Sequence, residues 1–116
     1  MMTLLCDHSV ICAQAITNEE ERKTVLKELT DPSLNTKPYK ILELDLNEIE
    51  GMCANMFNLV DRDGRNTLVM SDRARRTFRP DNIAELQKNY KVVVANIDMI
   101  EHVGGGSARC MLAERF

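Results

Sequence analysis

Short strand-like segments alternate with helix-start signatures along almost the whole chain, and this order constrains the fold more than any other feature. The segment 9–16 is a nearly apolar run containing Val and Ile, which is typical of a buried strand. In the segment 39–46 the leucines alternate with charged residues, which is typical of a half-buried strand. Three further strands are predicted at 56–60, 67–70 and 91–95.

Helix signals lie between these strands. Thr17 stands three residues before Glu20, the spacing of a capping box, and the Asp31-Pro32 pair ends the helix that this predicts. Asn47 and Glu50 repeat the spacing and predict a short helical turn. A second long helix is predicted from Pro80 to Tyr90. The Asp63-Gly64 pair predicts a tight hairpin, and the cluster Arg73, Arg75, Arg76 and Arg79 is interpreted as a solvated helix face.

Two similar α/β units follow from this order, over about residues 9–55 and 56–116. Each unit is too small to bury a sheet face alone. The length of 116 residues fits one domain. We therefore expect an α/β protein built from two repeats, with exposed strand edges.

Composition excludes several function classes. The net charge of −3 gives no electrostatic footprint for nucleic acid, and no apolar run approaches the ~20 residues of a membrane span. The four cysteines follow no secretory signal and form no CxxC pair, so we expect reduced thiols in the cytoplasm. Cys6, His8 and Cys12 match no zinc pattern, and we expect neither a metal nor a cofactor.

The segment 103–112 is the least ordinary part of the chain, because it holds three of the five glycines in one run. No Gly-Lys-Ser/Thr follows, which disfavours a phosphate-binding loop and with it a nucleotide-binding module. The run leads into Cys110, at the start of a predicted strand from 110 to 113. A cysteine at this junction is a nucleophile if its pKa is lowered, or otherwise a small core residue.

The segment from Gly104 to Met111 resembles the C-terminal nucleophile motif of the guanidino-group-modifying enzymes, which include arginine deiminases, amidinotransferases and dimethylargininase. Their fold is a five-bladed α/β propeller, the pentein fold. The resemblance is closer to amidinotransferase-like proteins that include a citrulline-utilisation hydrolase. It extends over nearly the whole chain, through residues 13–16, 19–23, 55–56, 68–71 and 104–116.

This resemblance implies a partial propeller of about two ββαβ-like repeats and a small arginine- or citrulline-like substrate. It makes Cys110 the nucleophile that attacks the guanidino or ureido carbon and forms a covalent intermediate. Asn55 matches a substrate-site asparagine that follows a glycine in the nearest relatives, although Ala54 stands here in place of that glycine. Gly105, Gly106 and Ser107 are expected to shape the loop beside the substrate. Cys12 and Cys53 are expected to be structural.

The resemblance also implies that this chain lacks the general acid/base histidine of the family. The general acid/base histidine of the family precedes two methionines that match Met1 and Met2. The histidines of this chain are His8, which is expected in a turn, and His102, which is expected in a loop. Neither of them matches the family histidine. The expectation is the C-terminal part of a hydrolase that is inactive alone, associating with itself or with an N-terminal portion. The alternative is a non-catalytic truncated or interaction protein that retains the fold. The choice among deiminase, ureido hydrolase and amidinotransferase stays open.

Overall fold

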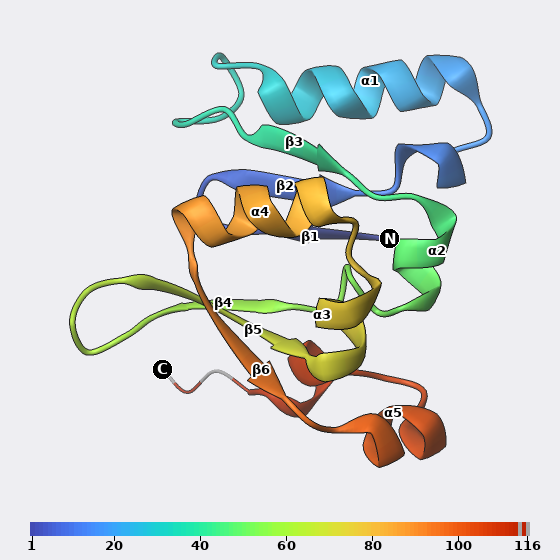
Figure 1. Ribbon diagram of the computed structural model, residues 1–116. Helices are drawn as coiled ribbons and strands as arrows, with labels where there is room; N and C mark the ends of the chain where they lie inside the picture. Colours follow the sequence, from blue (N-terminus) through green and yellow to red (C-terminus); the bar gives the residue numbers. More distant parts are fainter. Residues whose placement is uncertain (114, 116) are drawn as a thin grey trace.

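The computed structural model describes residues 1–113 and 115 and has a mixed α/β fold (Figure 1). Glu114 and Phe116, at the end of the resembling segment, lie outside the described residues. The described part contains two three-stranded sheets, five α-helices and two short 3-10 helices, and none of these helices combines the length and apolar character that crossing a membrane requires. The first half comprises β1 (Met2–Leu4), β2 (His8–Ile11), η1 (Ala13–Ala15), α1 (Glu19–Thr30), β3 (Lys40–Glu43) and α2 (Leu46–Glu50). The second half comprises β4 (Phe57–Val60), β5 (Asn66–Ser71), α3 (Asp72–Thr77), α4 (Pro80–Asn89), β6 (Lys91–Ala95), α5 (Asp98–Gly104) and η2 (Ala108–Met111).

The two sheets have the same topology. Each has its strands in sequence order, with the first pair antiparallel and the second pair parallel. A helical connection joins the parallel strands, through α1 in the first sheet and through α3 and α4 in the second. The predicted α/β class is therefore confirmed, and each sheet belongs to a ββαβ-like unit. The described residues form no closed ring of sheets, and the propeller stays a prediction.

One hydrophobic core joins the two units. Val10 and Leu42 from the first sheet belong to the same buried cluster as Leu68 and Met70 from the second, together with Leu86 of α4. In Figure 1 α4 lies in front of β1 and β2, and Glu85 of this helix contacts His8 of β2 at 3.3 Å. Because the two units share buried residues, neither has a core of its own.

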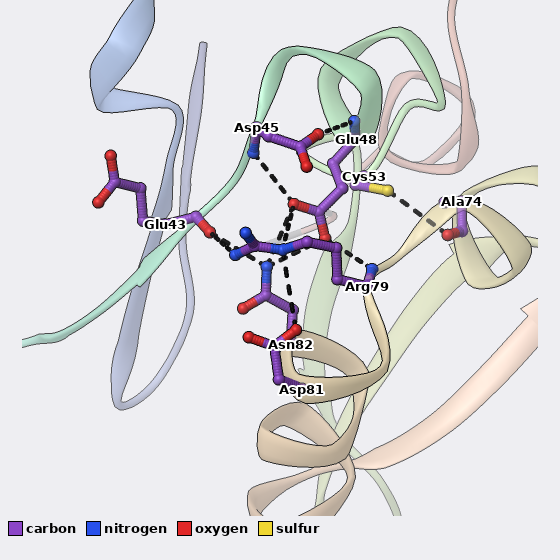
Figure 2. Close-up of polar contacts among 8 residues, drawn as sticks. All are labelled: Glu43, Asp45, Glu48, Cys53, Ala74, Arg79, Asp81 and Asn82. Carbon is purple, nitrogen blue, oxygen red and sulfur yellow. Dashed lines mark hydrogen bonds and ion pairs between the residues drawn. The ribbon is translucent and has the colours of Figure 1, made fainter.

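A buried carboxylate ties α2 to α4 (Figure 2). Glu48 is fully buried, and its carboxylate accepts hydrogen bonds from the backbone N–H groups of Asp45 and Arg79, at 3.0 and 2.8 Å. The Asn82 amide donates to both of its oxygens, at 3.0 and 3.2 Å. The Arg79 side chain adds a contact of 3.5 Å, so the buried charge is both paired and hydrogen-bonded.

Several predicted boundaries move by one to five residues. The strand predicted over 9–16 ends at Ile11, because its partner β3 is only four residues long and η1 follows. The helix caps are Asn18 and Asp45 rather than Thr17 and Asn47, and Asp45 forms its capping box with Glu48. The hairpin between β4 and β5 is confirmed, with Gly64 at φ 78°, but its loop spans five residues because Val60 pairs with Asn66.

Three predictions about local structure are wrong. His8 lies in β2 instead of a turn and is 1% exposed, since Tyr90 and Glu85 both bond its ring. His102 lies in α5 instead of a loop. The segment after Cys110 starts no strand; η2 replaces it, closed by the Cys110 N–H bond to the Ser107 carbonyl at 2.9 Å. In addition, β1 extends the first sheet to residues before position 9, where the first unit was predicted to begin.

Candidate active site

The turn after α2 presents Asn55 toward the second unit. The helix ends at Glu50 with Gly51 as its C-cap, and Met52 takes φ 65°, a left-handed conformation that a non-glycine residue rarely adopts. The Asn55 N–H then bonds the Met52 carbonyl at 2.9 Å. Gly51 is required by close packing, since a Cβ there would lie 2.3 Å from the Thr77 side chain of α3. Backbone strain and tight packing therefore fix the direction of Asn55.

The residue before Asn55 is anchored to the N-terminal strand. Ala54 is 3% exposed, and its carbonyl accepts a hydrogen bond from the Thr3 hydroxyl of β1. Ala54, the residue that departs from the family's glycine, is thus buried, and its backbone is held by Thr3. No local sequence pattern indicates this contact, because the two residues lie 51 positions apart.

Two glycines shape the segment that precedes Cys110. Gly105 ends α5 in the left-handed conformation, at φ 67°, and its N–H bonds the Glu101 carbonyl at 3.2 Å. A Cβ on Gly106 would lie 3.1 Å from Cys110 Cβ and 3.2 Å from its Sγ, so glycine allows the cysteine to approach. Gly104 has open space around it, so neither a left-handed conformation nor a close approach requires glycine there.

Asn55 and Cys110 meet across the two units. The Asn55 Nδ2 donates to Cys110 Sγ at 3.1 Å, while the Arg109 N–H donates to Asn55 Oδ1 at 3.0 Å. The amide therefore bridges the thiol and the backbone beside it. Cys110 is exposed, which makes its sulfur accessible to a substrate.

The environments of Cys110 and Cys53 shift the pKa values of their thiols in opposite directions. The hydrogen bond from Asn55 lowers the pKa of the Cys110 thiol, with smaller contributions from the Ser107 backbone and the Arg109 charge. Burial raises the pKa of Cys53 to about 12, with Glu48 and Asp45 adding to the effect. Cys53 donates instead to the Ala74 carbonyl at 3.4 Å. Of these two thiols, only Cys110 has the properties of a nucleophile.

Ser107 lies beneath Cys110 rather than beside an open site. Its side chain is fully buried and donates to Glu101 Oε1, while its carbonyl accepts the Cys110 N–H at 2.9 Å. Glu101 is itself 3% exposed, and its second oxygen, Oε2, is buried without a hydrogen-bond partner among the described residues. Sequence reasoning missed Glu101, although an acidic residue shortly before a glycine run was visible.

The apolar cavity beside η2 has a volume of about 150 Å³ and is lined by Val69, Ala95, Ile97, Ala108, Met111 and Leu112. Cys110 does not line it, and these side chains offer no partner for a cationic head group. The histidines are also placed elsewhere: both ring nitrogens of His8 are bonded within the core, and no hydrogen bond joins His102 to Cys110 in residues 1–113 and 115. The same residues contain no cluster of three or more His, Cys, Asp or Glu side chains able to hold a metal ion.

An exposed cysteine with a lowered pKa, set after a glycine-rich turn on ββαβ-like units, matches the class of guanidino-group-modifying enzymes of the pentein type. The model of the family described as eukaryotic N,N dimethylarginine dimethylhydrolase matches residues 1–116, and the chain belongs to this family. The match supports hydrolysis at the guanidino group of a small arginine derivative as the kind of function. It does not support the citrulline-utilisation type. Neither the curated proteins nor the solved structures give a significant match.

Proposed function

We propose that this chain supplies the nucleophile for hydrolysis of the guanidino C–N bond in an N-methylated arginine. The observation that carries the proposal is the hydrogen bond of 3.1 Å from Asn55 to an exposed Cys110 whose pKa is lowered. The family match supplies the substrate class, since its description names dimethylarginine.

The reaction begins with the Cys110 thiolate. It attacks the guanidinium carbon and forms a C–S bond, and the methylated amine leaves with a proton. Water then adds to the same carbon, the C–S bond breaks, and a ureido product leaves while the thiolate is restored. Asn55 stabilises the thiolate before attack and after release, because its amide donates to the sulfur.

Proton transfer needs a group beyond the contacts of Cys110. The leaving amine must receive a proton, a role commonly worth ~10²–10⁴-fold in rate. Neither histidine hydrogen-bonds Cys110 within the described part of the chain, since His8 is bonded to Tyr90 and Glu85. We therefore propose that the chain by itself does not turn over arginine, citrulline or methylated arginines at enzymatic rates.

The test measures amine and ureido product from dimethylarginine, with arginine and citrulline as comparison substrates. The full chain is assayed alone and with imidazole added as an external proton carrier. We expect no enzymatic turnover by the chain alone and slow product formation with imidazole that Cys110→Ala abolishes. Product formation that Cys110→Ala leaves unchanged, or none in either arm, contradicts the nucleophile assignment. Rapid Cys110-dependent turnover without imidazole contradicts the proposal that the chain by itself lacks a group to protonate the leaving amine.

A non-catalytic interaction protein is the second candidate, and an exposed apolar surface favours it. Met99 and Val103 of α5 are 81% and 82% exposed, and the neighbouring edge strand β6 exposes Val93 and Val94. Exposed apolar side chains next to an unpaired strand edge are typical of an association site. An interaction role predicts that Cys110→Ala leaves every measurable property of the chain unchanged.

A further inference from the structure

We propose that Glu101 is the positioning residue of the nucleophile segment and that it acts through Ser107. This inference rests on the proposed function, because it assigns a role to Glu101 in preparing the Cys110 thiol. Glu101 makes no hydrogen bond to Cys110 and touches no reacting atom among the described contacts, so its effect must be indirect.

Glu101 holds the segment at two points. Its backbone carbonyl accepts the Gly105 N–H at 3.2 Å, which closes the end of α5. Its side chain, through Oε1, accepts the hydroxyl hydrogen of Ser107. Ser107 in turn accepts the Cys110 N–H at its carbonyl, at 2.9 Å. A continuous series of hydrogen bonds thus runs from α5 to the backbone of the nucleophile.

Stability alone does not explain the carboxylate of Glu101. Burying an ionisable group is unfavourable unless its oxygens are hydrogen-bonded or paired. Oε2 of Glu101 is buried and has no partner in the described part of the chain, whereas both Glu48 oxygens accept hydrogen bonds. A buried polar atom without a partner requires an explanation. Because the other oxygen, Oε1, accepts the Ser107 hydroxyl, we infer that the carboxylate is retained for that contact.

The direction in which the Cys110 pKa shifts distinguishes a positioning role of Glu101 from a direct effect of its charge. If Glu101 holds Cys110 where Asn55 can reach it, loss of the Ser107–Glu101 bond weakens the Asn55–Cys110 hydrogen bond and raises the pKa of the thiol. If Glu101 acted only as a nearby negative charge, its removal would favour the thiolate and lower that pKa. The two roles therefore predict opposite shifts.

The experiment follows alkylation of Cys110 by iodoacetamide against pH in the full chain carrying Cys6→Ser, which removes the other exposed cysteine. Mass spectrometry reports the modification of each thiol, and protection of the buried Cys53 reports that the variant is folded. The variants are Ser107→Ala, Glu101→Leu and Glu101→Gln. Glu48→Gln is the matched control, since it changes a buried carboxylate in the other unit.

We expect Ser107→Ala and Glu101→Leu to raise the alkylation midpoint by about half a pH unit or more, a roughly threefold lower rate at neutral pH. Glu101→Gln, which keeps an oxygen acceptor for Ser107, is expected near the parent profile, as is Glu48→Gln. Should Glu101→Leu not fold, Ser107→Ala gives the same test.

An unchanged or lowered midpoint in Ser107→Ala or in folded Glu101→Leu overturns the proposal. A Glu101→Gln profile shifted as far as that of Glu101→Leu also overturns it. Alkylation requires no turnover, so a failed product assay beside a shifted profile rejects the proposed reaction and retains the positioning role.

Discussion

The two units each place a buried glutamate and then a cysteine after the third strand, yet the pairs differ in the hydrogen bonding of the carboxylate and in the exposure and pKa of the thiol. In the first unit, Glu48 is saturated by hydrogen-bond donors, and Cys53 is fully buried with a pKa of about 12. In the second, Glu101 keeps one oxygen without a partner in the described structure, and Cys110 is exposed with a lowered pKa.

The comparison shows that contacts between the units, rather than the shared topology, decide which cysteine can react. Arg79 and Asn82 belong to the second unit and complete the network around Glu48 in the first. Asn55, at the end of the first unit, contacts the Cys110 thiol in the second. Each unit therefore completes a polar site on the other, one structural and one suited to nucleophilic chemistry.

The largest effect on stability is expected from removing Glu48, the hydrogen-bonded buried carboxylate of the first unit. Glu48→Ala removes the acceptor of the Arg79 backbone N–H and leaves the buried Asn82 amide with the Glu43 carbonyl as its remaining acceptor, and breaking such a network commonly costs about 3–5 kcal/mol. The measurement is the free energy of unfolding in urea. The control Asp81→Ala removes a carboxylate that is 75% exposed and should cost less than about 1 kcal/mol. Equal costs for the two variants would show that Glu48 contributes no more than a surface charge.

The next effect concerns the pH dependence of stability. The pKa of Cys53 is about 12 in the folded chain, against 9.0 as its ordinary value, so the folded state retains a proton that the unfolded state releases. This contribution is fully present below pH 9 and is lost as the pH rises toward 12, by at most about 1.4 kcal/mol per pH unit. Unfolding at pH 8 and pH 10.5 should therefore differ more for the parent chain than for Cys53→Ala. An equal change in the free energy of unfolding for the two proteins would show that the Cys53 thiol does not contribute to the pH dependence of stability.

A smaller effect is expected at the glycines. Gly106→Ala places a Cβ within 3.2 Å of Cys110 Sγ, so the thiol must shift and its alkylation at neutral pH should fall a few-fold. Gly104→Ala is the matched control, because nothing lies within 4 Å of the new Cβ and the backbone is not left-handed. A slower reaction in both variants would point to general loosening of the segment instead of a close approach at Gly106.

Local signals explain which elements could be predicted from the sequence. The strand over 91–95 and the hairpin at Gly64 were predicted because residue type alone favours them. The helix α5 was missed because its N-cap, Ile97, makes no capping hydrogen bond and three glycines follow the apolar residues. The caps at Asn18 and Asp45 lay one and two residues from the predicted positions, since neighbouring polar residues offer similar signals.

The candidate site was harder to predict, because it depends on contacts between distant residues. Cys110 and Asn55 were chosen through a family resemblance, and their hydrogen bond joins residues 55 positions apart. The burial of Ser107 and Glu101 depends on how the segment folds back after α5, which no local pattern specifies. The sequence therefore indicated Cys110 as a candidate nucleophile, but not the residues that contact it.

The most direct test of the central claim is the pH dependence of Cys110 alkylation in the Cys6→Ser chain, compared with the same chain carrying Asn55→Ala. Because the Asn55 amide is the largest cause of the lowered pKa, we predict a Cys110 midpoint below the ordinary value of 9.0 that rises toward it in Asn55→Ala. Cys53 should remain unmodified in both proteins, since it is fully buried. Coincident profiles for the two proteins, or modification of Cys53 before Cys110 in folded protein, would contradict the account.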